Sequence, residues 1–250
     1  MLFMLRQAIL GESPSSSLQN ASVCVLSGAD EDAGLAATHT MLDCLTEQST
    51  SLREKRAAYV PADDSDTAAF IRFPGHGGLL FTAQCSSAEP ALLENTSEYI
   101  ASLSRQAETY REAVPPASNV DYRMHFQGMP KAMVGWIRSN TLFRVPERQR
   151  WLARLFLKMH HISRKKTGNM NRSILCIFGR DEGSPSAMTV TGSTVFGMTA
   201  AFAAAVAKVH LQRRHDIPPG VHFAHPYWLP PSEVLPILRQ VGVEVYYVTC

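Results

Sequence analysis

The sequence predicts an α+β domain built on a mixed, largely antiparallel sheet that is covered by helices. Two patterns lead to this prediction: strand-like runs alternate with helical periods along the chain, and several strands are joined by short turns, as in hairpins. The composition agrees, because 250 residues that are 45% hydrophobic and 18% charged are typical of a globular protein. A chain of this length buries a core without disulfides or metal ions.

In the first half, the clearest predicted unit is a strand followed by an acidic turn and a helix. Residues 21–26 form a continuous β-rich run typical of a buried strand, and apolar residues at helical spacing predict a helix over 33–45. A hairpin is predicted around the turn at 74–78, because β-rich runs flank it. The other elements predicted here are a helix at 2–10, a polar connection at 46–56, strands at 57–60, 68–73, 79–83 and 121–127, and a helix at 90–103.

The second half is predicted to end in a strand pair, a helix-rich segment and a closing strand. The predicted elements are strands at 172–179 and 187–191, a helix at 196–211, a short strand at 221–223, a helix at 231–241 and a strand at 243–248. The most apolar stretch, 195–209, is Ala-rich and shorter than the roughly 20 residues that a membrane span requires. Because the start of the chain also shows no signal-peptide pattern, a cytoplasmic location is expected.

A further helix, predicted at 146–162, is amphipathic and strongly basic. Its apolar residues at three- and four-residue spacing are predicted to face the core: Trp151, Leu155, Met159 and Ile162, with Leu152 and Phe156 beside them. Its cations lie elsewhere on the helical wheel: Arg148, Arg150, Arg154 and Lys158. Two interpretations of the basic face stay open, solvation or contact with an anionic membrane or a partner protein. Nucleic acid is not expected as a partner, since the net charge is only +2.

The sequence contains no motif for nucleotide, dinucleotide, zinc-protease or serine-hydrolase chemistry: GxGxxG, GxxxxGK[ST], HExxH and GxSxG are all absent. The five cysteines are widely spaced without a CxxC pair, which predicts reduced, buried and unreactive thiols. His222 and His225 have HxxH spacing but no neighbouring Cys or carboxylate, so no metal site is predicted.

Five polar residues are candidate substrate-binding residues: Asp30, Arg72, His76, Glu89 and His125. Each lies at the end of a predicted strand or in a turn, where polar groups converge on a small anionic or amino-acid-like ligand. The alternative is that these are solvated loop residues, because their positions along the chain do not show that they meet in space. No catalytic residue is assigned.

A set of short motifs is spread over most of residues 20–248. In the C-terminal part these are Phe178-Gly-Arg-Asp181, Gly197-Met-Thr-Ala200, Pro219-Gly-Val221, Pro230-Pro231 and Leu238-Arg-Gln-Val-Gly-Val243. Earlier they are Val25-Leu-Ser-Gly-Ala-Asp30 with Gly34-Leu35, Phe73-Pro-Gly-His-Gly77 and Ala88-Glu-Pro-Ala-Leu-Leu93. Together they resemble the region beyond the Rossmann domain of saccharopine dehydrogenase-like oxidoreductases. The chain departs from the family pattern at one turn, where Asp32-Ala33 replaces Pro-Gly.

The resemblance implies a substrate-binding and dimerisation domain, similar to that of saccharopine reductase, over residues 21–250. Residues 1–20 would then be an N-terminal helix and linker left from a cofactor domain. The family uses NAD(P), but this chain is expected to bind no cofactor itself and to be inactive unless a separate Rossmann domain is supplied. The partners implied are a small-molecule substrate, a second copy in a homodimer and a cofactor-domain subunit. The alternative is a non-enzymatic interaction module that retains the fold and binds a partner protein or an anionic membrane through the helix at 146–162.

Overall fold

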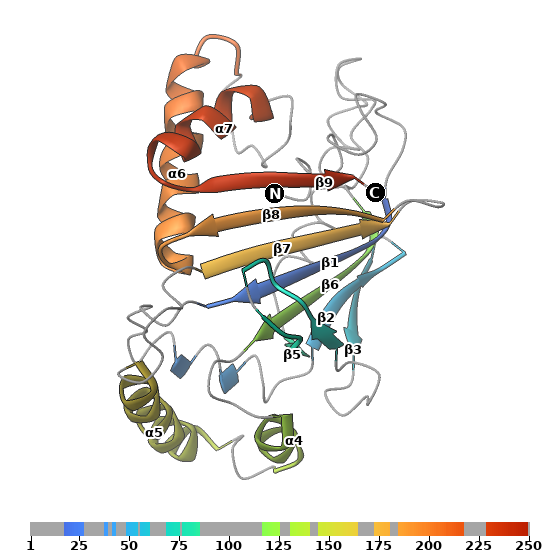
Figure 1. Ribbon diagram of the computed structural model, residues 1–250, viewed down its shortest axis with the longest axis vertical. Helices are drawn as coiled ribbons and strands as arrows, with labels where there is room; N and C mark the ends of the chain where they lie inside the picture. The colour runs from blue at the N-terminus through green and yellow to red at the C-terminus, as the bar shows by residue number, and fades with distance from the viewer. Residues whose placement is uncertain are drawn as a thin grey trace.

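A computed structural model shows one mixed sheet with helices packed against it (Figure 1). The structure describes residues 18–27, 38–39, 42–43, 49–54, 56–60, 69–75, 77–85, 117–125, 131–140, 145–164, 173–180, 185–217 and 229–249. The strands are β1 (Leu18–Leu26), β2 (Ser49–Arg53), β3 (Arg56–Val60), β4 (Ala69–Ile71), β5 (Leu80–Gln84), β6 (Ala117–His125), β7 (Ser173–Arg180), β8 (Pro185–Gly192) and β9 (Glu244–Thr249). The helices are α4 (Lys131–Ser139), α5 (Pro146–Arg164), α6 (Val195–Gln212) and α7 (Pro231–Gln240).

The main path of the sheet runs β3-β2-β6-β1-β7-β8-β9. Strand β5 also pairs with β6, near Met124, and β4 pairs with β5. Among the described strands, β1 and β6 form the one parallel pair, and the other pairings are antiparallel. The predicted fold class, a mixed and largely antiparallel sheet with helices, is therefore confirmed.

One face of the sheet packs against α6 and α7. Side chains at alternate positions of a strand point to the same face, and on this face they are Ala21 and Val23 of β1 with Leu175 and Ile177 of β7. The helices contribute Met198, Ala205 and Val209 from α6 and Val234 and Leu238 from α7. This cluster extends across β8 and β9, so it forms the largest part of the described core.

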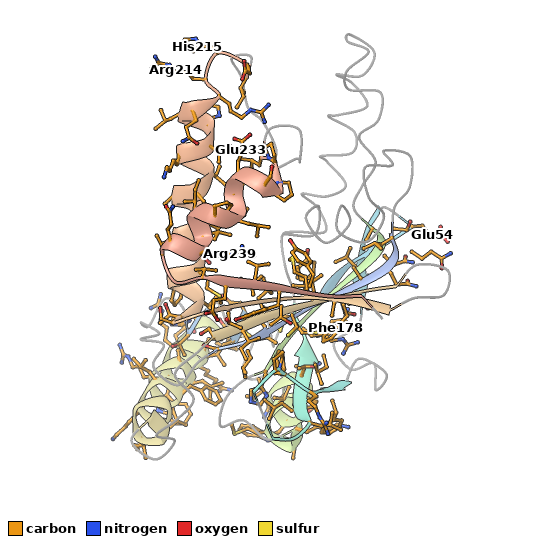
Figure 2. All side chains as sticks on the ribbon, turned by 45° about the horizontal axis from the view of Figure 1, so that its top comes forward. Glu54, Phe178, Arg214, His215, Glu233 and Arg239 are labelled. Atoms are coloured by element: carbon orange, nitrogen blue, oxygen red, sulfur yellow. The ribbon has the colours of Figure 1, made fainter. Side chains whose placement is uncertain are left out.

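The β4–β5 hairpin covers the opposite face of β1 and β7. Cys24 and Leu26 of β1 and Ile174 and Cys176 of β7 form a second cluster there. The fully buried Phe73, which follows β4, belongs to the same cluster. Figure 2 shows Phe178, which packs against this cluster, on the side of the sheet that faces the hairpin. The centre of the sheet is thus buried on both faces.

Helices α4 and α5 pack together on β5, in a third cluster. Val134 and Ile137 of α4 meet Leu152, Ala153 and Phe156 of α5, and β5 supplies Ala83 beside Cys85 and the separate residue Leu42. Figure 1 shows both helices at one end of the molecule, away from α6 and α7. This cluster fixes which face of α5 is turned inward.

The orientation of α5 corrects the sequence prediction. Trp151, Leu155 and Ile162 were expected to face the core, but they are 61%, 38% and 54% exposed. Leu152 and Phe156, expected beside that face, are buried instead, together with Ala153. The physical reason is that the apolar residues of α5 span a wide arc, and the partners in the third cluster select one edge of it.

Three other predictions differ from the structure in extent. The polar connection at 46–56 contains β2, which pairs with β3 through the register Leu52↔Ala57. Strand β6 begins at Ala117 rather than at residue 121, and β1 begins at Leu18 rather than at residue 21. Helix α4 was not predicted at all. The predicted elements at 2–10, 90–103 and 221–223 lie outside the described residues.

Helix α6 extends the predicted apolar stretch by three residues, to Gln212. Within the described parts of the chain, it is the one helix whose length and composition would allow it to cross a membrane. Met198, Ala205 and Val209 of α6 are buried in the first cluster, so one side of the helix packs against the sheet, while most of its other residues are exposed or half-buried.

The start of α6 depends on a close approach to β8. A Cβ atom at Gly192, the last residue of β8, would lie 2.4 Å from Cγ of Met198, so only glycine leaves room for that side chain. Thr194 caps the helix, because its Oγ1 accepts a hydrogen bond of 2.8 Å from the backbone N–H of Gly197. These contacts set the direction in which α6 leaves the sheet.

Cys24 and Cys176 lie opposite each other in the β1–β7 pairing, and both are buried and reduced. Burial raises the pKa of the Cys24 thiol to about 12 and also raises the pKa of the Cys176 thiol. The hydroxyl of Thr189, 3.7 Å from Cys176 Sγ, acts in the opposite direction on Cys176. The thiolate is the reactive form of cysteine, so both side chains act as small apolar groups of the core.

Replacing the cap residue should destabilise the protein measurably. We expect Thr194→Ala to lower the free energy of unfolding by about 1 kcal/mol, because a backbone N–H in the first turn of α6 loses its acceptor. Urea titration followed by circular dichroism measures this. Thr199→Ala is the matched control in the same helix. The Thr199 hydroxyl donates to the carbonyl oxygen of Val195, but within an α-helix that oxygen also accepts a backbone N–H, so the variant leaves no group without a partner. Equal losses in the two variants would contradict the capping role.

The buried thiols should resist alkylation in the native protein. With a pKa of about 12, roughly one Cys24 side chain in 10,000 is a thiolate at pH 8, whereas in the unfolded chain a sizeable fraction is. Iodoacetamide labelling at pH 8, read for each cysteine by peptide mass spectrometry, should therefore modify Cys24 and Cys176 only after guanidinium is added. Fast labelling of either residue in the native state, or a disulfide between them, would contradict this burial.

Candidate functional site

The carboxyl ends of β1 and β6 lie side by side, because these two strands are parallel. Their register pairs Leu26, the last residue of β1, with His125, the last residue of β6. In sheets that contain parallel strands, ligands commonly bind just beyond the carboxyl ends of those strands. This end of the sheet is therefore the candidate functional site.

His125 is held in a defined orientation at this end. Its Nδ1 lies 2.8 Å from the carbonyl oxygen of Phe81 in β5. A carbonyl oxygen can only accept a hydrogen bond, so Nδ1 carries the proton and donates. In the neutral ring, Nε2 then keeps its lone pair and is able to accept a hydrogen bond or a proton from a ligand.

Arg72 reaches the same end of the sheet through the β4–β5 hairpin. The next residue, Phe73, packs fully buried in the cluster that contains Leu26, the β1 residue opposite His125. Arg72 itself is exposed. A guanidinium group in this position offers a planar pair of donors that suits a carboxylate or phosphate. Arg72 follows β4 and His125 ends β6, and both strands belong to one β4–β5–β6 unit.

The structure thus describes two of the five predicted site residues. Asp30, His76 and Glu89 lie outside the described residues. Strand β5 runs antiparallel to β6, and the residue that follows it, Cys85, donates its N–H to the carbonyl oxygen of Tyr122.

A polar cluster beside the third hydrophobic cluster was not predicted. Gln84 is buried, and its Nε2 donates to Asp121 Oδ1 at 3.2 Å. A guanidinium nitrogen of Arg138, in the last turn of α4, donates to the backbone carbonyl of Gln84. Burial lowers the pKa of Arg138, and the nearby Arg123 acts in the same direction. The cluster fastens α4 to β5. Arg138 could have been found from its position at the end of an amphipathic segment, had α4 been recognised.

Among the described residues, no group of three or more His, Cys, Asp or Glu side chains is arranged to hold a metal ion. Between β1 and β6 the described chain includes the strands β2, β3, β4 and β5.

Comparison with known proteins gives a match to a solved structure but none to a family profile or a curated protein. Among solved structures, the chain is similar to the apo form of histidine-tagged saccharopine dehydrogenase (L-Glu forming) from Saccharomyces cerevisiae. The TM-score is 0.47 and the sequence identity 14%, over 94% of this chain and 67% of that chain.

Proposed function

We propose that this chain is the substrate-binding portion of a saccharopine dehydrogenase-like oxidoreductase and that it holds an amino-acid-like ligand at the β1–β6 end of the sheet. The observation that carries the proposal is the register Leu26↔His125, which brings the two strand ends together beneath the hairpin that bears Arg72. The sequence motifs described above, which are spread over most of the chain, support the same assignment.

The two described site residues have complementary roles in this proposal. Arg72, exposed beside the anchored Phe73, binds a carboxylate of the ligand through two parallel hydrogen bonds. His125, fixed through Nδ1, presents Nε2 to a polar hydrogen of the ligand. Together they would orient an amino dicarboxylate without taking part in cofactor binding.

We assign cofactor binding to a different domain or subunit, because the sequence contains no GxGxxG motif. In oxidoreductases of two-part construction, one part holds the nicotinamide and the other positions the substrate, and the rate depends on how well the two are aligned. The residues described here would supply only this positioning.

A thermal-shift experiment tests the proposal. Because a ligand that binds the folded state stabilises it by mass action, an amino dicarboxylate at 100 times its dissociation constant should raise the melting temperature by about 5–10 °C. NADH and NADPH should leave the melting temperature of this chain unchanged. A nucleotide-induced shift, or no response to any amino dicarboxylate, would overturn the assignment.

Two variants locate the site, with a matched control. Arg72→Gln should weaken amino dicarboxylate binding at least about tenfold, since a charge-assisted hydrogen bond is lost. His125→Asn keeps a donor for the Phe81 carbonyl but removes Nε2, so it should weaken binding while leaving the unliganded melting temperature nearly unchanged. Arg239→Gln, at an exposed arginine of α7, is the control and should bind normally. Wild-type affinity in both site variants would place the ligand elsewhere.

A further inference from the structure

The outward side of α5 presents large apolar side chains to solvent. Trp151, Leu155 and Ile162 are all exposed, and on an ideal helix they lie within about 40° of one another. They form a narrow stripe along about 16 Å of the helix. We call this stripe, together with the cations described next, the outer face of α5.

Cations flank the apolar stripe on both sides. Arg148 lies on one side of it, and Arg150, Arg154 and Lys158 lie on the other, and all four are exposed. Glu147 is the one acidic residue in the sequence of α5. The outer face is therefore an apolar strip with a strongly positive border.

The helix cannot turn this face inward without breaking the core. Leu152, Ala153 and Phe156 on its other side are buried in the cluster shared with α4 and β5. Turning the helix would remove Leu152, Ala153 and Phe156 from a packed cluster and leave a space that the exposed residues are not shaped to fill. The outer face is thus presented to solvent by the fold itself.

We infer that the outer face of α5 binds the surface of an anionic lipid bilayer. A helix that lies in the plane of a membrane buries an apolar stripe at the boundary between headgroups and acyl chains, while flanking cations contact anionic headgroups. Tryptophan favours this boundary, because its ring is apolar and its N–H remains able to donate a hydrogen bond. The residues of α5 match each requirement, and this surface is separate from the ligand site at the β1–β6 end.

Other partners fit the outer face less well. A nucleic acid would use the cations, but it offers no apolar surface along a strip that includes Leu155 and Ile162. A stable protein interface buries about 800 Å² on each partner through some 20–30 residues, and a stripe of three apolar side chains on a convex helix is much smaller. A bilayer needs no complementary groove, and it contacts both charged borders at once.

Vesicle co-sedimentation of the full chain tests the inference. The protein should bind vesicles of phosphatidylcholine with 30% phosphatidylserine and not bind phosphatidylcholine alone. Binding should fall steeply as sodium chloride is raised to 0.5 M, because salt screens exposed charges. Binding should also shift tryptophan emission to shorter wavelength, and Trp151→Phe should remove most of that shift.

Two double variants separate the apolar and the electrostatic contributions. Arg150→Glu with Arg154→Glu should weaken vesicle binding by about 25-fold or more, since each cation near the membrane contributes about fivefold. Trp151→Ser with Leu155→Ser should abolish the emission shift and most of the binding. Both pairs of side chains are exposed, so the melting temperature should stay close to that of the wild type.

Matched controls lie near α6 and α7. Arg214→Glu with Arg239→Glu makes the same change in net charge at exposed positions, which Figure 2 shows beyond α6 and on α7. Phe196→Ser with Leu211→Ser removes two comparably exposed apolar side chains from α6. Both controls should bind vesicles like the wild type. An equal loss of vesicle binding in a control and in its α5 counterpart would overturn the inference. A protein that does not bind vesicles, but binds polyuridylate even after Trp151→Ser with Leu155→Ser, would also overturn it.

Discussion

The fold depends on β1 being buried on both of its faces and paired along both of its edges. Ala21 and Val23 face the helices α6 and α7, whereas Cys24 and Leu26 face the β4–β5 hairpin. Along its edges, β1 joins β6 in parallel and β7 in antiparallel direction. A central strand with apolar neighbours on both faces tolerates no shift in register, because a slip by one residue would exchange its two sets of side chains. The helical layer, the hairpin and the end of β6 are all positioned by this one strand.

Much of the sheet could be predicted from local sequence. The strands β7, β8 and β9 and the helices α6 and α7 lie within two residues of their predicted bounds, because each is a single apolar or periodic run between strong turn residues. Strand β2 was missed, since its sequence Ser-Thr-Ser-Leu-Arg has little apolar alternation, and its pairing with β3 and β6 makes it a strand. Helix α4 was not predicted, although Val134 and Ile137 are at the three-residue spacing that buries one side of a helix.

The two proposed surfaces were harder to predict than the sheet, for two different physical reasons. At the candidate ligand site, Arg72 and His125 are 53 positions apart, so only the pairing of β4, β5 and β6 reveals that their strands form one unit. In α5 the apolar residues were identified from the sequence, but the ones predicted to be buried are exposed, and their neighbours Leu152 and Phe156 are buried. Periodicity shows that Trp151 and Leu152 belong to one apolar arc. Which of the two is buried depends on Ala83 and Cys85, which are far away in sequence. Tertiary partners decide which part of a broad apolar arc is buried.

Strand β5 connects the two proposed surfaces. Its Phe81 carbonyl fixes the ring of His125 at the ligand end, and two residues further along, Ala83 packs with the buried side of α5. Arg138 adds a hydrogen bond from α4 to Gln84 of the same strand. Because a short, hydrogen-bonded strand is stiff over three residues, an α5 helix lying flat on a bilayer would hold the β1–β6 end at a fixed orientation to the membrane surface. An amino-acid-like ligand would then be bound at a constant position relative to the headgroups, and the geometry of β5 would set that position.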